Sequence, residues 1–217
     1  MSLLNADTIF ALATPPGMSA IAVIRISGDK ALQVPQLFDV AAGVVRTAKR
    51  VFLKEENGTI IDDVMVLGFA APASATGEDV LEIHCHGSVA VIDDILSVLA
   101  KTEGFRAAEP GEFTRRALDN GKMDITAAEG LADLIEAETA MQRRQASAQM
   151  TGQLSRPVGF WRAEIARLLA HLEAIIDFAD EELPEALRQE IAADTAKLCA
   201  ELETALDDQR FGEIIRN

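Results

Sequence analysis

Aromatic residues are scarce in this chain of 217 residues, which contains nine Phe, one Trp and no Tyr. Proteins that bind single-stranded nucleic acid commonly stack the bases on aromatic side chains. Basic residues are also in the minority, because 20 Lys and Arg face 35 Asp and Glu, and the formal net charge is −15. Phosphate backbones are bound by clustered Lys and Arg side chains. The composition therefore argues against a protein that binds nucleic acid tightly by itself.

Long hydrophobic runs are missing, and cysteines are few. No stretch approaches the roughly 18 to 20 uncharged apolar residues that a membrane-spanning helix needs, and the N-terminus lacks the basic and apolar regions of a secretory signal. The two cysteines, Cys85 and Cys199, lie far apart, which is typical of free thiols in a reducing compartment. These absences predict a soluble, cytoplasmic protein that does not associate with membranes.

The Gly-rich motifs that bind nucleotides are missing as well. Gly121-Lys122 is the only Gly-Lys pair, but Arg116 stands where a P-loop needs its first Gly, and Met123 stands where it needs Ser or Thr. The sequence contains neither GxGxxG nor Cys-x-x-Cys. These residues are therefore not expected to bind a nucleotide through either Gly-rich motif.

What is present in residues 1–122 is an irregular mixture of strand and helix patterns. Compact or alternating apolar runs predict five strands, and apolar residues at helical spacing predict two helices, with a third helix beginning near residue 110. This mixture predicts an α+β domain. The predicted strands span residues 8–13, 20–26, 51–53, 64–69 and 80–85, and the two helices span residues 30–38 and 89–100.

Residues 123–217 have helical periodicity in every long window and predict an all-α domain of three long helices. Gly152 and Pro157 predict one break between helices, and residues 180–184 predict another. The apolar stripes are wide enough that we expect one of them to meet a partner. This half also carries most of the acidity, with a net charge of −10 against −5 for residues 1–122.

The densest polar cluster lies in residues 77–87, within the last predicted strand and around it. Strand alternation places Glu82, His84 and His86 on one face and Cys85 on the other. One carboxylate and two imidazoles on one face suit a metal site or acid–base chemistry. They equally suit a carboxylate that holds a His ring by a hydrogen bond. We favour a polar organic ligand on this face and expect no metal.

Two cations stand out because of their surroundings. Arg25 lies inside an apolar strand, where a guanidinium must find an anion or reach solvent. Its simplest interpretation is an arginine on an edge strand, paired with Glu78 or Asp79. Lys122 lies in a turn at the predicted domain boundary, where ligand sites tend to form, although lysines in turns are commonly solvated.

Two further charged clusters are interpreted as solvent-exposed features without a ligand. Arg115 and Arg116 follow Glu112 in the helix that begins near residue 110 and could receive an anion, but a solvated helix face is the simpler interpretation. The acidic residues 180–182 are interpreted as a loop between helices.

Several separated motifs occur in an order that resembles the MnmE (TrmE) family of bacterial tRNA-modification GTPases. Together they span nearly the whole chain. They are DTI at residues 7–9, ATPPG at 13–17, IRISG at 24–28, TGEDVLE at 76–82, CHG at 85–87, PGEFT at 110–114, NGKMD at 120–124, EGLADLI at 129–135 and AIIDF at 174–178.

The resemblance implies a fold, a cofactor and partners. It implies an N-terminal α+β domain (residues 1–122) that is similar to folate-dependent aminomethyltransferases, binds a tetrahydrofolate derivative (5-formyl- or 5,10-methylene-tetrahydrofolate) and forms a homodimer. Residues 123–217 would be the first part of a helical domain. The folate contacts of the family map onto Arg25, Glu82 and Lys122 of this sequence, with Glu82 accepting hydrogen bonds from the pterin and the two cations meeting carbonyl or carboxylate oxygens.

The resemblance also implies that the family's GTPase domain follows residue 217, so that GTP, Mg²⁺ and K⁺ would bind there. With the FAD protein MnmG, the family adds an aminomethyl-type group at carbon 5 of the wobble uridine of tRNA. One departure is Ser88, which follows Gly87 where the family usually has a second Gly.

Two other interpretations of the chain remain open. One is a non-catalytic module for interaction or dimerisation. The other is a metal-dependent enzyme that uses Glu82, His84 and His86.

Overall fold

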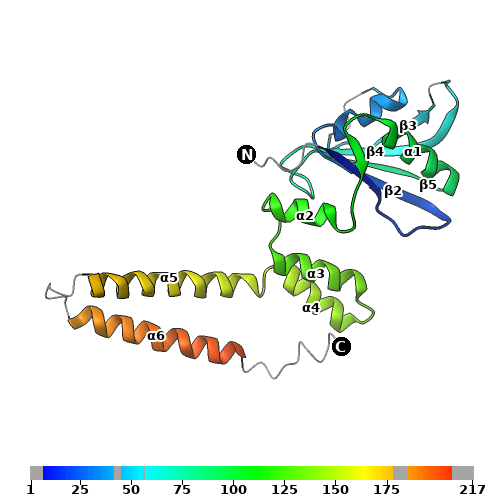
Figure 1. Cartoon of the computed structure of the whole chain (residues 1–217). Helices are drawn as coiled ribbons and strands as arrows, with labels where there is room; N and C mark the ends of the chain where they lie inside the picture. Colours follow the sequence, from blue (N-terminus) through cyan, green and yellow to red (C-terminus); the bar gives the residue numbers. More distant parts are fainter. Residues whose placement is uncertain (1–6, 42–44, 56, 178–184, 207–217) are drawn as a thin grey trace. The chain divides into compact units, whose positions relative to one another are not determined.

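The computed structural model describes residues 7–41, 45–55, 57–177 and 185–206. The chain divides into two compact units, residues 1–123 and residues 124–217, which are drawn together in Figure 1. The first unit combines a sheet with helices, and the second is entirely helical. The predicted fold class, an α+β domain followed by an all-α domain, is confirmed.

A six-stranded sheet forms the first unit, with the strand order β3-β4-β5-β2-β1-β6. Neighbouring strands run antiparallel except β1 and β6, which run parallel. Strands β2 and β5 therefore lie at the centre. The strands are β1 (Thr8–Leu12), β2 (Ser19–Ser27), β3 (Lys49–Lys54), β4 (Ile60–Phe69), β5 (Val80–Gly87) and β6 (Phe105–Ala107).

Strand alternation divides the side chains between the two faces of the sheet. Ile24 and Ile26 of β2 are fully buried in a core that includes Ile95 of helix α1 (Val89–Lys101) and Phe38 of the 3₁₀ helix η1 (Ala31–Phe38). Residues between them in sequence, such as Arg25, point to the opposite face. The second helix, α2 (Glu112–Asp119), ends just before the turn that carries Lys122.

For this unit the structure specifies the type of one predicted helix and adds a strand that was not predicted. Residues 30–38 were expected to form a short helix of unspecified type, and the structure has a 3₁₀ helix with Pro35 inside it. Proline has no N–H and clashes with the preceding turn of an α-helix, which explains the tighter form. The edge strand β6 was not predicted, because a three-residue strand is too short to show a period.

The second unit contains four helices within the described residues, not three. They are α3 (Ile125–Glu136), α4 (Ala140–Met150), α5 (Ser155–Asp177) and α6 (Glu185–Leu206). The break between α3 and α4 comes from Thr139 and Gln142, which form a capping box at the start of α4. Gly152 separates α4 from α5 with a positive φ of 88°, whereas Pro157 lies in the first turn of α5, where its missing N–H has no cost. The break predicted at residues 180–184 lies outside the described residues.

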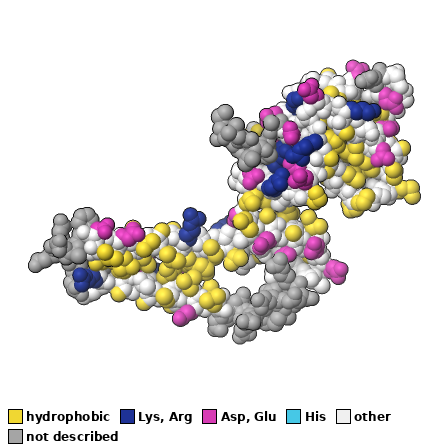
Figure 2. Space-filling model, viewed as in Figure 1, with side chains coloured by type: hydrophobic (Ala, Val, Ile, Leu, Met, Phe, Trp, Pro, Cys, Tyr) yellow, Lys and Arg dark blue, Asp and Glu magenta, His cyan; other side chains and the backbone are white. Residues whose placement is uncertain are grey.

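Helices α5 and α6 pack through a small apolar cluster that includes Leu168, Ile191 and Leu198. Hydrophobic side chains extend well beyond this contact, as the yellow stripe along these helices in Figure 2 shows. The exposed members on α5 are Val158, Phe160, Ile165, Leu169, Leu172 and Ile176. A partner for this stripe stays a prediction. No helix in the described part of the chain has the length and apolarity to cross a membrane.

Candidate functional site

Arg25 and Glu82 form an ion pair on the two central strands. They lie directly opposite each other in the β2–β5 register, and Arg25 Nε and Nη2 donate to Glu82 Oε1 over 3.0 and 2.7 Å. The Arg25 side chain is 34% exposed and that of Glu82 is 16% exposed. The prediction of an edge-strand arginine paired with Glu78 or Asp79 is therefore wrong. The pair is a half-buried, charged feature in the middle of the sheet face opposite the core.

The two histidines of β5 have different partners. His84 Nε2 lies 3.3 Å from Glu82 Oε2, which extends the Arg25–Glu82 pair along the strand. His86 instead contacts Asp62, with Nδ1 2.7 Å from Oδ1 and the backbone N–H donating to Oδ2 over 2.8 Å. Within the described residues, no three His, Cys, Asp or Glu side chains are grouped to hold a metal ion.

Lys122 packs against the loop between β4 and β5 (residues 70–79), here called the β4–β5 loop. Its Nζ donates to the carbonyl oxygen of Pro72 over 2.9 Å. Gly77 in that loop has a φ of 82°, and a Cβ there would lie 3.2 Å from Lys122 Cγ and 2.9 Å from Asn120 Cβ. The close approach of Lys122 therefore needs a glycine at residue 77. The structure brings Arg25 and Glu82 into contact and holds Lys122 separately, against this loop.

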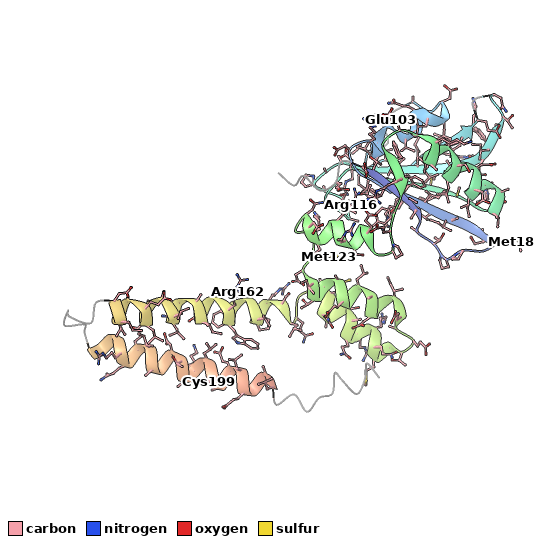
Figure 3. All side chains as sticks on the ribbon, viewed as in Figure 1. Met18, Glu103, Arg116, Met123, Arg162 and Cys199 are labelled. Carbon is pink, nitrogen blue, oxygen red and sulfur yellow. The ribbon has the colours of Figure 1, made fainter. Side chains whose placement is uncertain are left out.

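Helix α2 carries a buried charge network that was interpreted from the sequence as a solvated helix face. That prediction is wrong for Arg116, labelled in Figure 3, because its side chain is fully buried. Arg116 Nη1 donates to Glu78 Oε2 over 2.9 Å, and Nη2 donates to Glu112 Oε1 over 3.2 Å. Arg115, by contrast, is exposed. The sequence signal was the i, i+4 spacing of Glu112 and Arg116, but nothing local showed that this face is buried.

Glu112 is held ionised by its neighbours. The Arg106 guanidinium donates to both of its carboxylate oxygens, from Nη1 over 2.8 Å and from Nη2 over 2.6 Å. These hydrogen bonds, with further ones from the Glu109 backbone and Arg116, lower the pKa of Glu112 to about 2 despite the opposing effect of burial. Glu112 is therefore ionised at neutral pH and forms a fully buried pair with Arg116.

Cys85 is buried, which does not favour a role as a nucleophile. It points into the core, opposite Glu82 and His84, and its Sγ lies 3.6 Å from the carbonyl oxygen of Ala22. Burial raises the pKa of this thiol to about 11, so almost no thiolate exists at neutral pH. Both Cys85 and Cys199 are free.

A hollow of about 330 Å³ lies beside the Arg25–Glu82–His84 row. His84 and Met65 line it together with Ile21, which is 62% exposed, and with the ion pair between Arg50 and Asp63. The lining combines apolar side chains with charged and polar ones, which suits a flat organic ring.

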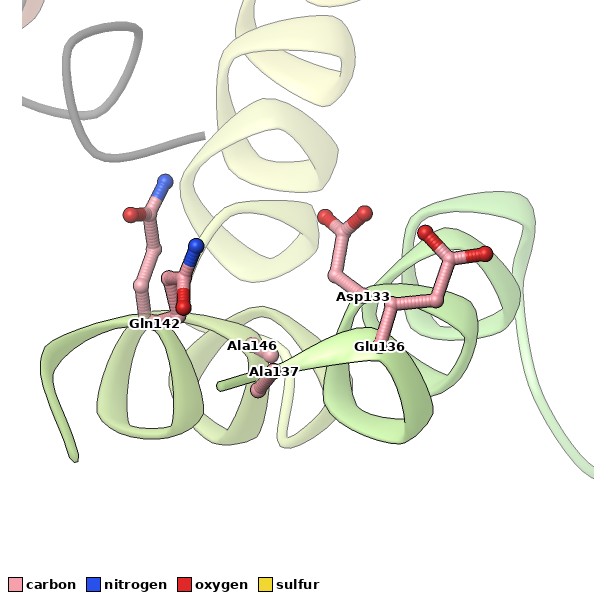
Figure 4. A pocket seen from close by; sticks show the side chains of 6 residues that line it. Asp133, Glu136, Ala137, Gln142 and Ala146 are labelled. Atoms are coloured by element: carbon pink, nitrogen blue, oxygen red, sulfur yellow. The ribbon is translucent and has the colours of Figure 1, made fainter. Parts of the chain in front are cut away.

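A second hollow, of about 170 Å³, lies between α3 and α4 of the helical unit (Figure 4). Its polar lining consists of carboxylates from α3 and amides from α4. The side chains are Asp133, Glu136, Gln142 and Gln145. None of the residues that we predicted to bind a ligand lies here.

Both units match models of known protein families. The family model described as "GTP-binding protein TrmE N-terminus" matches residues 8–122, and the model described as "MnmE helical domain" matches residues 125–217. The chain belongs to the MnmE family. The two matches fall on the sheet-containing unit and the helical unit respectively.

Curated relatives carry the name "tRNA modification GTPase MnmE". The protein of Ruegeria pomeroyi is 49% identical over 210 residues, which cover 97% of this chain and 49% of the relative. The proteins of Paramagnetospirillum magneticum and Azorhizobium caulinodans are 46% and 48% identical, over 97% and 98% of this chain and 48% and 49% of their own lengths. The chain thus spans about half the length of the curated relatives it matches.

Proposed function

We propose that this chain is the folate-binding and dimerising portion of a tRNA-modification GTPase. Membership of the MnmE family supports the reaction class, since the relatives are named for tRNA modification and GTP hydrolysis. The observation that carries the folate assignment is the Arg25–Glu82 ion pair at the centre of the sheet. The ligand would be a tetrahydrofolate derivative, either 5-formyl- or 5,10-methylene-tetrahydrofolate.

The pair offers the polar groups that a pterin requires. Glu82 Oε1 is occupied by Arg25, while Oε2 has, among the described residues, only the 3.3 Å contact with His84 and can accept hydrogen bonds from pterin N–H groups. Arg25 uses Nε and Nη2 for the pair, so its guanidinium retains donors for a ligand oxygen. Lys122 supplies a second cation for a carbonyl or carboxylate of the ligand.

The partners in this proposal follow from charge and from surface character. Met65 and Phe52 are about half exposed on the same face as His84, and a second copy of the chain would cover such side chains in a homodimer. The net charge of −15 argues that tRNA is bound mainly by the FAD protein MnmG or by other segments of the full protein. GTP, Mg²⁺ and K⁺ would bind the GTPase domain, and the protein would act in the cytoplasm.

Binding of 5-formyltetrahydrofolate to this chain, measured by isothermal titration calorimetry, tests the proposal. We expect the wild-type chain to bind, and Arg25→Ala and Glu82→Ala each to weaken binding at least about tenfold, because hydrogen bonds to charged groups contribute about 1.5–3 kcal/mol. Arg115→Ala is the matched control, since this exposed arginine forms side-chain ion pairs only with Glu109 and Glu112 among the described residues. No binding by the wild type, or unchanged binding by both variants, contradicts the folate assignment and favours a non-catalytic interaction module.

A further inference from the structure

We infer that Ser27, Glu78 and Arg116 are positioning residues that hold Lys122 in place relative to the Arg25–Glu82 pair. The inference rests on the proposed folate site and names the side chains that set its geometry. None of the three would contact the ligand itself, because Ser27 and Arg116 are fully buried and Glu78 is bound to both.

The first link joins strand β2 to the β4–β5 loop. Ser27 lies two residues after Arg25 on the same strand, so the two side chains share a face. Ser27 Oγ donates to Glu78 Oε2 over 2.8 Å and lies 2.7 Å from Thr76 Oγ1. Because a hydroxyl has a single hydrogen, Thr76 is the donor in the second contact. Both loop residues are therefore tied to the strand that carries Arg25.

The second link joins the same loop to helix α2. Arg116 Nη1 donates to Glu78 Oε2 over 2.9 Å and to the carbonyl oxygen of Asp7 over 3.1 Å, while Nη2 donates to Glu112 on its own helix. The planar guanidinium serves all three partners through two nitrogens held in a fixed fork, a geometry that the single nitrogen of a lysine ammonium lacks. One buried side chain thus ties the helix and the loop together.

The third link is between the loop and Lys122. The turn after α2 is held to the loop by Asn120 Nδ2, which donates to the Thr76 carbonyl oxygen over 2.9 Å. Lys122 itself donates to Pro72 and packs on Gly77. A lysine on a free surface loses much of its rotamer freedom when it binds an anion. Fixing the loop against which Lys122 packs reduces that entropic cost for a bound ligand.

A double-mutant cycle tests this role, because residues that act through one another have non-additive effects. The Kd for 5-formyltetrahydrofolate is measured for Ser27→Ala, Arg116→Lys and Lys122→Ala, and for the first two combined with Lys122→Ala. We expect each single variant to raise the Kd about tenfold. An effect of this size lies within the range measured for residues that interact with one another. Each double variant should bind no more weakly than Lys122→Ala alone.

The control is Arg167→Lys, which disturbs the ion pairs of Arg167 with Glu164 and Asp194 in the helical unit. Its folate affinity should equal that of the wild type. If Arg116→Lys does not fold, as judged by its NMR spectrum, the test uses the milder Ser27→Ala variant, alone and combined with Lys122→Ala. If the wild type binds and the increases in Kd of the single variants multiply in the double variants, the positioning role is contradicted, but the folate site is not. Absence of wild-type binding overturns both.

Discussion

Replacing Arg116 with methionine is expected to lower the free energy of unfolding of the sheet-containing unit by about 3–5 kcal/mol. Methionine keeps much of the side-chain volume but removes the charge. Glu78 and the Asp7 carbonyl oxygen then lose their buried donor. Breaking a largely buried ion pair from one side is costly because the remaining carboxylate, here Glu78, loses its cationic partner and keeps a neutral donor, the Ser27 hydroxyl.

The measurement is a urea titration followed by NMR signals of β2 and β5. Tryptophan fluorescence cannot serve, since the single tryptophan, Trp161, lies in the helical unit. Arg115→Met is the matched control, because the neighbouring Arg115 side chain is 54% exposed, and exposed ion pairs contribute about 0–1 kcal/mol. Equal stability of the two variants would mean that the buried network contributes no more than a surface pair.

Acid is expected to remove about 3 kcal/mol of stability from the same unit through Glu112 alone, because each tenfold change in proton affinity between the folded and unfolded chain corresponds to about 1.4 kcal/mol. The pKa of this carboxyl falls from an ordinary 4.5 to about 2 in the folded state. A depressed folded-state pKa stabilises the fold above the unfolded value. The contribution is therefore complete above pH 4.5 and is lost as the pH falls toward 2.

Other carboxylates titrate in the same range, so the test compares wild type with Glu112→Gln. Urea titrations at pH 6, 4 and 2.5, followed by the same β2 and β5 signals, give the difference in unfolding free energy between the two chains. That difference should shrink steadily as the pH falls. A difference that stays constant from pH 6 to 2.5 would show that the charge of Glu112 does not contribute to stability.

Five of the six strands, and the importance of Arg25 and Glu82, could be predicted from the sequence. Alternation in β5 predicted the faces of Glu82 and Cys85 correctly, because side-chain direction in a strand is a local property. The partner of Arg25 was wrong, since strand order decides which carboxylate lies opposite, and strand order depends on contacts between distant segments. Lys122 stood out only through its place at a boundary and through family resemblance.

The buried network could not be predicted for the same reason. Arg116 contacts Glu78, 38 residues earlier in the chain, and Asp7, 109 residues earlier. The hydrophobic periodicity of an eight-residue helix contains no information about contacts with such distant residues. The capping box of Thr139 and Gln142, in contrast, is a local signal that was present in the sequence, and it would have placed the break between α3 and α4.

A crystal structure of this chain with 5-formyltetrahydrofolate bound is the decisive measurement for the proposed folate site. We expect the pterin on the sheet face opposite the core, with its N–H groups within hydrogen-bond distance of Glu82 Oε2 and a ligand oxygen at Arg25 or Lys122. Ligand bound elsewhere, such as in the groove lined by Leu37, Lys54 and Lys101, with the Arg25–Glu82 pair untouched, would contradict the assignment.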